Sequence, residues 1–198
     1  MTGCGQGTGA GEKRRAVFLD RDGTINVEKE YLHRVEDFEF IPGALEAIRL
    51  IGDAGFLVVV VTNQSGIGRG FYDEAALERL HSFMDMELER VGAKIDAYYF
   101  CPHHPSHGQG KYAVDCACRK PLPGMLLQAA ADLGIDLAAS FIVGDKLADV
   151  AAGLAAGCRP FLVMTGYGAE SAGEMPPGGR LVPDILAAAR EIVCISPD

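Results

Sequence analysis

The sequence predicts an α/β fold, a three-layer, doubly wound and mostly parallel sheet with helices on both faces. Short apolar runs alternate along the chain with stretches whose apolar residues recur at helical spacing. The run 56–61 is unbroken and rich in β-branched residues, as is typical of a strand covered on both faces. With 198 residues and no long linker, the chain is expected to form one domain without a large cap domain.

The expected elements alternate strand and helix along the chain. Strands are predicted at 16–19, 56–61, 97–100, 141–143 and 161–164, and helices at 42–54, 73–91, 123–133, 148–156 and 183–193. Asp73 is a plausible N-cap, because its carboxylate can accept a hydrogen bond from the first turn. Gly134 is expected to end its helix, since glycine adopts the left-handed conformation easily.

Composition limits the classes of partner. Asp and Glu (27) outnumber Lys and Arg (18), giving a net charge of −9, which argues against a nucleic-acid or anionic-membrane binder. No apolar run approaches the ~18 residues of a membrane span. Residues 1–15 form a Gly-rich segment without the apolar stretch of a signal peptide. We therefore expect a flexible tail at 1–15, a single domain at 16–198, cytoplasmic residence and a monomer.

Polar residues suited to phosphate and Mg²⁺ follow each of the first four predicted strands. They are Asp20-Arg21-Asp22-Gly23-Thr24, Thr62-Asn63-Gln64-Ser65-Gly66, Arg119-Lys120 at the end of a cysteine-rich loop, and Gly144-Asp145-Lys146. Ligands of doubly wound folds bind beyond the carboxyl ends of the strands, where these groups would converge. Each group alone is an ordinary loop residue, but their joint occurrence indicates a catalytic site.

The converging groups suffice for phosphoryl transfer. One of the Asp20 and Asp22 carboxylates can attack a phosphoryl group, while the other exchanges protons with the leaving alkoxide and then with water. Asp145 would add a third carboxylate for Mg²⁺. Thr62 and Lys120 can stabilise the equatorial oxygens of the transferring group. Gly23 and Gly66 would allow tight turns against the ligand.

A second cluster lies in the loop 101–118. Cys101-x-His103 and Cys116-x-Cys118 together offer three thiolates and one imidazole, the ligand set of a closed structural zinc site. The one-residue inner spacing differs from the common two-residue knuckle, so a free-thiol loop and a disulfide remain open on the residues alone. A catalytic zinc is disfavoured, because four protein ligands leave no open position.

These motifs resemble one family. The segments 18–26, 61–67, 101–105, 116–121 and 143–146 are similar to the heptose bisphosphate phosphatases of the haloacid dehalogenase superfamily, and the likeness runs over about residues 16–166. It implies a haloacid dehalogenase-like fold in which 101–118 is an inserted zinc-binding loop, with His103 as the histidine ligand. The implied reaction is Mg²⁺-dependent release of the C7 phosphate of a heptose 1,7-bisphosphate, a phosphorylated sugar used for bacterial surface glycans.

The resemblance also implies residue roles. Asp20 would be the nucleophile and Asp22 the general acid and base. Mg²⁺ would be held by Asp20, Asp145 and the backbone carbonyl of Asp22, while Arg119 would contribute to substrate recognition. The implied substrate contacts are Asp20, Arg21, Asp22, Glu28, Lys29, Glu30, Tyr31, Thr62, Asn63, Gln64, Ser65, Arg119, Lys120 and Lys146.

The chain departs from the family pattern at Glu30, where members often carry Gly, and this leaves the preferred anomer open. Histidinol-phosphate phosphatases share the first motif and the cysteine loop, but they usually carry Asp at the position of Ser65. A non-enzymatic phospho-receiver domain is a third alternative. Such domains are shorter and lack the cysteine loop, so both rivals are disfavoured.

Overall fold

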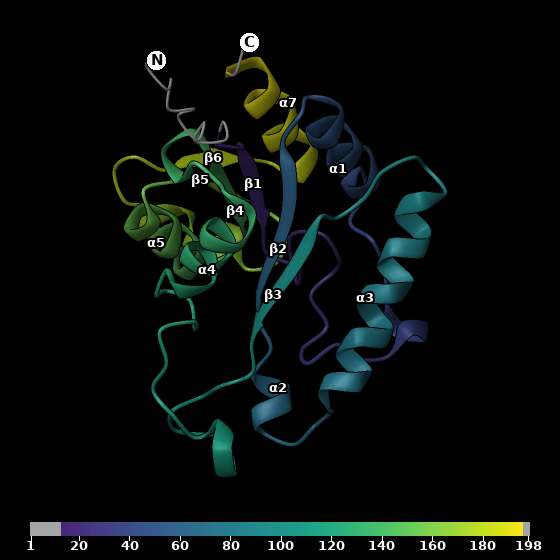
Figure 1. The fold of residues 1–198 in the computed structure, drawn as a ribbon, viewed down its shortest axis with the longest axis vertical. Coiled ribbons are helices and arrows are strands. Elements are labelled where there is room, and N and C mark those ends of the chain that lie inside the picture. Colours follow the sequence, from purple (N-terminus) through teal and green to yellow (C-terminus); the bar gives the residue numbers. More distant parts are fainter. Residues whose placement is uncertain (1–12, 196–198) are drawn as a thin grey trace, which may run out of the picture.

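A six-stranded, fully parallel sheet forms the centre of the computed structural model, which describes residues 13–195 (Figure 1). The strands are β1 Ala16–Leu19, β2 Leu57–Asn63, β3 Ala97–Cys101, β4 Phe141–Gly144, β5 Arg159–Val163 and β6 Arg180–Val182. Their order across the sheet is β3-β2-β1-β4-β5-β6. The predicted doubly wound sheet is therefore confirmed, with β6 as an edge strand that the sequence did not predict.

Helices cover both faces of this sheet. They are α1 Ala44–Asp53, α2 Ser65–Gly68, α3 Glu74–Glu89, α4 Gly124–Leu133, α5 Leu147–Ala156, α6 Gly168–Ser171 and α7 Ile185–Ile195. Both predicted helix boundaries are confirmed: Asp73 Oδ1 accepts a hydrogen bond from the Ala76 amide (2.8 Å), and Gly134 ends α4 with φ +67°. The short helices α2 and α6 were not predicted.

Alternate side chains of the central strand enter two separate cores. Val17 and Leu19 pack with residues of α1 and α7, while Ala16 and Phe18 pack with residues of α4 and α5. In Figure 1, α4 and α5 lie together on one side of the strands, with α1, α3 and α7 on the other. Because both faces are covered, β1 and β2 need an almost continuous apolar sequence.

The strand order places a crevice beside β1. Chain connections lead from β1 to β2 on one side, and the chain returns to β4 on the other side. The direction of the connections thus reverses between β1 and β4, and at this point the helices that follow the two strands lie on opposite faces of the sheet. The loops after β1 and β4 therefore diverge and can enclose a ligand. Asp20 directly follows β1 and Asp145 directly follows β4.

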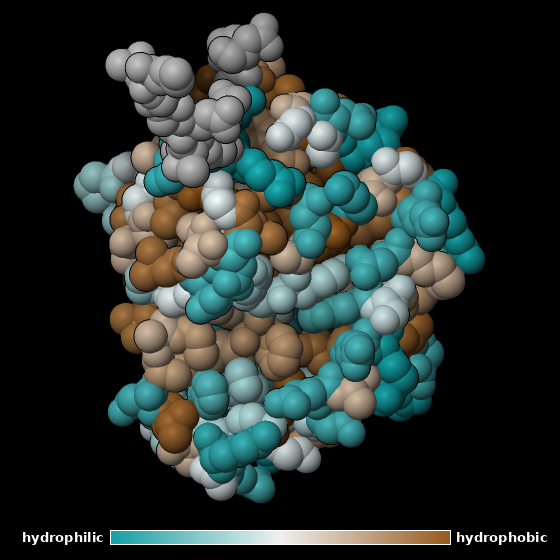
Figure 2. Space-filling view, in the orientation of Figure 1, coloured by the Kyte–Doolittle hydropathy of each residue, from teal (hydrophilic) through white to brown (hydrophobic). Residues whose placement is uncertain are grey.

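The fold makes its first described contacts before β1. The Arg14 amide donates to the Gly134 carbonyl (2.9 Å), and the Asp136 amide donates to the Arg14 carbonyl (2.8 Å). The predicted tail lies mostly outside the described residues. Within residues 13–195, no helix combines the length and the apolar character needed to cross a membrane. On the face drawn in Figure 2, groups of apolar residues are interspersed with hydrophilic ones.

Candidate active site and metal centre

A cavity of ≈ 420 Å³ opens at the carboxyl ends of the strands. It is lined by Asp20, Asp22, Glu28, Glu30, Tyr31, Thr62, Asn63, Gln64, Ser65, Gly66, Arg69, Tyr72, Arg119, Lys120, Lys146, Ala148, Asp149 and Tyr167. The implied substrate contacts all line this cavity except Arg21 and Lys29. Arg21 is fully buried beneath it, and Lys29 pairs with Glu39 (3.2 Å).

Asp20 lies at the inner end of the cavity. Its side chain is buried, and its Oδ1 accepts hydrogen bonds from the Arg21 amide (2.8 Å) and the Lys120 ammonium (2.9 Å). No donor among the described residues contacts Oδ2. One carboxylate oxygen is thus held in place while the other keeps its lone pairs available.

Lys120 joins Asp20 to a carboxylate that was not assigned from the sequence. Its Nζ contacts Asp20 Oδ1, Asp149 Oδ1 (2.5 Å) and the Val61 carbonyl (2.7 Å), which uses all three ammonium protons. Burial lowers the pKa of Lys120, but the two carboxylates outweigh it and the net shift is upward. We name Asp20, Lys120, Asp145 and Asp149 the buried charge cluster.

Asp22 lies in the cavity wall beside Asp20. Its carboxylate accepts from the Arg21 guanidinium (2.9 Å to each oxygen), from Asn26 Nδ2 (3.1 Å) and from Gln64 Nε2 (3.0 Å). Burial raises the pKa of this carboxyl, but the charge of Arg21 and these hydrogen bonds together leave it below its usual range. Arg21 therefore holds Asp22 in place from beneath the cavity.

Asp145 has the environment of a cation ligand. It is fully buried, its Oδ1 has no hydrogen-bond partner within residues 13–195, and its Oδ2 accepts from the Tyr167 amide (2.9 Å). Burial and then the Asp20 carboxylate raise the pKa of Asp145 to about 8. Carboxylate oxygens of Asp20, Asp145 and Asp149 lie within 4.8 Å of one another. This oxygen-donor set fits Mg²⁺.

Gly23 keeps this region open. Its φ of +80° is a left-handed conformation, which agrees with the predicted tight turn. A Cβ at this position would lie 2.1 Å from Asp145 Oδ2, so any larger residue would displace the buried carboxylate.

The residues after β2 support this cluster. Asn63 exchanges two hydrogen bonds with the backbone of Lys120, through Nδ2 to its carbonyl (3.0 Å) and Oδ1 from its amide (3.1 Å). Gln64 is buried and donates from Nε2 to Thr62 Oγ1 (2.8 Å). Both amide side chains, predicted as substrate contacts, thus also fix neighbouring site residues.

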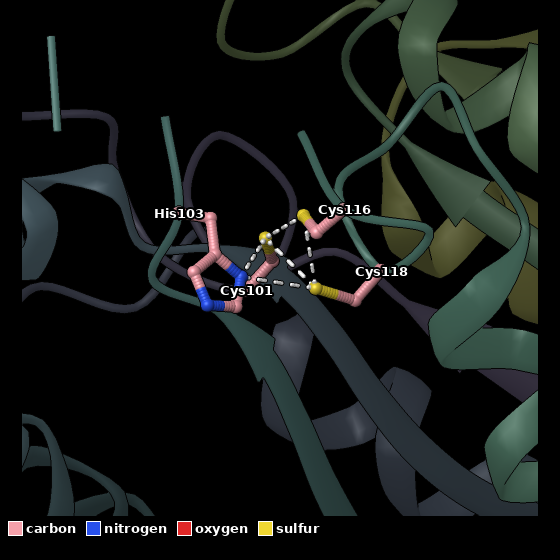
Figure 3. A group of neighbouring side chains, drawn as sticks. All are labelled: Cys101, His103, Cys116 and Cys118. Atoms are coloured by element: carbon pink, nitrogen blue, oxygen red, sulfur yellow. Dashed lines mark hydrogen bonds between the residues drawn. The ribbon is translucent and has the colours of Figure 1, made fainter. Parts of the chain in front are cut away.

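The four predicted zinc ligands come together at the end of β3 (Figure 3). The sulfur atoms lie 3.2–3.5 Å apart, and His103 Nδ1 lies 3.4 Å from Cys118 Sγ and 3.7 Å from Cys101 Sγ. A disulfide would need about 2.05 Å, so the three thiols are free. Zinc with metal–sulfur bonds of about 2.3 Å makes a tetrahedron with edges of about 3.8 Å, which the group approaches.

This cysteine–histidine group is tied to the cavity. Arg119 directly follows Cys118, and its Nη1 donates to the His103 carbonyl (3.2 Å). The Gln109 amide donates to the Gly68 carbonyl in α2 (2.7 Å). The loop 101–118 therefore connects the cysteine–histidine group with Arg119 and with α2, both of which lie next to the active-site cavity.

The segment 28–31 forms another wall of the cavity. Glu28 pairs with Lys146 (3.1 Å), and Glu30 and Tyr31 have φ values of +40° and +53°. Glu30 thus occupies a backbone conformation that favours glycine. The Tyr31 ring contacts Phe71 edge-on (4.8 Å between centroids), and the Arg69 guanidinium lies over it.

Five lining residues were missed from the sequence: Arg69, Tyr72, Ala148, Asp149 and Tyr167. Only Asp149 had a usable signal, namely an acid four residues after Asp145. Gly66 was assigned to a ligand turn, but a Cβ there would lie 2.2 Å from the Tyr72 ring. The absence of a side chain at Gly66 therefore leaves space for the Tyr72 ring.

The chain is similar to curated enzymes of one kind. It is 49% identical over 160 residues to the D-glycero-beta-D-manno-heptose-1,7-bisphosphate 7-phosphatase of Yersinia pestis, which covers 80% of this chain and 85% of the relative. Identity to the enzyme of the same name from Escherichia coli K12 is 51% over 152 residues, or 76% and 80% of the two chains. Residues 117–189 also match the HAD-hydrolase-like family.

Solved structures agree with this similarity. The D,D-heptose 1,7-bisphosphate phosphatase from B. bronchiseptica, complexed with magnesium and phosphate, superposes with a TM-score of 0.84 at 38% identity. The match covers 92% of this chain and 99% of that structure. The enzyme from Burkholderia thailandensis matches with a TM-score of 0.68 at 37% identity, over 91% and 99% of the two chains.

Proposed function

Because the chain belongs to the D-glycero-beta-D-manno-heptose-1,7-bisphosphate 7-phosphatase family of the haloacid dehalogenase superfamily, we propose that it removes the C7 phosphate of that sugar bisphosphate. The observation that carries this proposal is the position of Asp20, buried at the end of β1 with a free Oδ2 and Lys120 on its other oxygen. The relatives' names support the beta anomer as the substrate.

In the proposed mechanism, the Asp22 carboxylate first takes up the proton of the C7 phosphate monoanion. Asp20 Oδ2 then attacks the C7 phosphorus while Asp22 gives this proton to the departing C7 alkoxide. The bond from phosphorus to the sugar oxygen breaks, and an aspartyl-phosphate forms. Asp22 then takes a proton from water, whose oxygen attacks phosphorus and releases inorganic phosphate. Arg21 and Asn26 hold Asp22 within reach of both reactions.

Lys120 and Thr62 stabilise the transferring phosphoryl group. The Lys120 ammonium is saturated by Asp20, Asp149 and the Val61 carbonyl before the reaction. Attack consumes the charge of Asp20, which weakens one of these contacts and frees an ammonium proton for a phosphoryl oxygen. Asp149 keeps Lys120 in place during this exchange.

Two metals complete the proposal. Mg²⁺ would be held by Asp20, Asp145 and the Asp22 carbonyl, and it would supply positive charge next to the phosphoryl oxygens. The magnesium and phosphate bound to the B. bronchiseptica relative support this assignment. Structural Zn²⁺ would be held by Cys101, His103, Cys116 and Cys118, which fixes the loop that carries Arg119 and Lys120.

The second phosphate of the substrate would be bound by Arg69 and Arg119. Both guanidiniums line the cavity, and neither has a carboxylate partner among the described residues. The Arg69 Nε is buried without a hydrogen bond to any residue that the structure describes. Two guanidiniums without a carboxylate partner in the described part of the chain favour an anionic second group over the ammonium group of histidinol phosphate.

Phosphate release from both anomers of heptose 1,7-bisphosphate, from heptose 7-phosphate and from histidinol phosphate, with and without Mg²⁺, tests this function. We expect the beta bisphosphate to give the highest kcat/KM, and only when Mg²⁺ is present. A higher kcat/KM for histidinol phosphate would overturn the assignment.

We also propose that the chain works as a monomer in the cytoplasm. The three neighbouring cysteines would bind Zn²⁺ as thiolates rather than form a disulfide, which fits a reducing compartment. The net charge of −9 supports the absence of a nucleic-acid partner.

A further inference from the structure

Gln64 connects Tyr72, which no role above explains, to two residues of the reaction. The Tyr72 hydroxyl donates to Gln64 Oε1, while Gln64 Nε2 donates to Thr62 Oγ1 (2.8 Å) and to Asp22 Oδ2 (3.0 Å). Gln64 and Thr62 are both buried, so water does not replace these contacts readily. The amide therefore has a donor on its oxygen and acceptors on its nitrogen.

The amide orientation decides how Thr62 presents its hydroxyl. With Nε2 facing Thr62, the hydroxyl oxygen accepts a hydrogen bond and its own proton remains available. If the amide turned over, Oε1 would face Thr62 and capture that proton. The Thr62 hydroxyl would then direct only its oxygen lone pairs into the cavity, and these repel the oxygens of a phosphate.

We propose that Tyr72 is a positioning residue, which acts through Gln64 to direct the Thr62 hydroxyl proton into the cavity. This inference rests on the proposed role of Thr62 in stabilising the phosphoryl group. Asp22 is also held by Arg21 and Asn26, whereas Gln64 provides the only hydrogen bond to Thr62 Oγ1 among the described residues. The effect of Tyr72 is therefore expected to reach the substrate mainly through Thr62.

The Tyr72 ring is held firmly enough for this role. One part of it fills the space beside Gly66, and its face stacks on the His33 ring at 4.9 Å between centroids and 6° between planes. Burial raises the pKa of the Tyr72 hydroxyl, so it stays a proton donor at neutral pH.

A double-mutant cycle tests the inference on the full chain with Mg²⁺ and heptose bisphosphate. Tyr72→Phe keeps the ring and removes the hydroxyl, and we expect kcat to fall about tenfold with KM changed less than about twofold. Thr62→Val should lower kcat more. In the Thr62→Val background, Tyr72→Phe should cause no further loss, because the proton it positions is gone.

Matched variants separate positioning from general damage. Tyr99→Phe removes a hydroxyl bonded to Asp132 (2.9 Å) elsewhere on the sheet and should leave kcat unchanged. If Tyr72→Phe folds poorly, Gln64→Met is the second variant. It should lower kcat at least as much in the wild-type background and clearly less after Thr62→Val, where only its contact with Asp22 remains to be lost.

The outcomes distinguish the two proposals. Equal losses from Tyr72→Phe in both backgrounds, or an unchanged kcat in the wild-type background, would overturn the positioning role and leave the proposed function intact. An unchanged kcat in Thr62→Val would instead contradict the role of Thr62 on which the inference rests.

Discussion

The buried charge cluster and the loop 101–118 meet at one edge of the sheet, but they are held there by different forces. Asp20 and Asp145 directly follow strands whose backbone is fixed by parallel pairing on both sides. Within the loop, the one regular element is the 3-10 helix Gly110–Tyr112. The strands therefore hold the cluster in position, whereas we expect the shape of the loop to depend on the proposed zinc and its four side-chain ligands.

The largest effect is expected from Asp20→Asn. An amide cannot act as the nucleophile, so kcat should fall by ~10³-fold or more while the strand pairing persists. Phosphate release measures the fall in kcat, and circular dichroism shows whether the fold persists. A variant that keeps the wild-type rate would show that the covalent mechanism is wrong.

Lys120→Met tests whether charge also stabilises the cluster. The substitution leaves the Asp20 and Asp149 carboxylates without their buried cation, which should lower the free energy of unfolding by about 3–5 kcal/mol. Lys146→Met is the matched control, because the Lys146 side chain is 41% exposed and its pair with Glu28 should contribute at most about 1 kcal/mol. Urea denaturation of both variants gives their free energies of unfolding. Equal decreases in the two variants would show that the charge of Lys120 does not stabilise the buried charge cluster.

Loss of zinc should affect the loop and leave the sheet folded. Cys116→Ala, or removal of the metal by a chelator, is expected to lower kcat/KM about 10- to 100-fold by releasing Arg119 and Lys120. Hydrogen exchange should become faster in 101–118 but not in β1 or β2. Cys194→Ala, which changes an exposed cysteine, is the control. Full activity without zinc by elemental analysis would refute this role.

The smallest expected effect comes from His81 in α3, which belongs to neither region. Burial lowers its pKa to about 3, so the unfolded chain binds a proton near pH 6.5 that the folded chain does not. Neutral His81 does not reduce the free energy of unfolding above pH 6.5. Below pH 6.5 its proton uptake in the unfolded chain should reduce that free energy by at most about 1.4 kcal/mol per pH unit. His81→Phe should reduce this slope in denaturation between pH 7 and pH 5.5. An unchanged slope would assign the acid sensitivity to groups other than His81.

The parts that the sequence predicted are those that local pattern determines. Short runs of β-branched residues such as 56–61 are typical of strands in a covered sheet, and residues directly after parallel strands meet at its edge. The strand β6 has three residues and begins with an exposed Arg180, so its pattern is too short to detect. The contact of Tyr72 with Gln64 depends on tertiary packing, which no spacing in the sequence reveals. The spacing of Asp149 from Asp145 placed it near the site, but did not indicate its contact with Lys120.

The space shared by Gly66 and Tyr72 also has an evolutionary consequence. A side chain at position 66 would collide with the ring at position 72, so a larger residue can be accepted only after the ring is lost. Losing the ring would also remove the hydroxyl that contacts Gln64. Across descendants of this gene, positions 66 and 72 are therefore expected to change together or not at all.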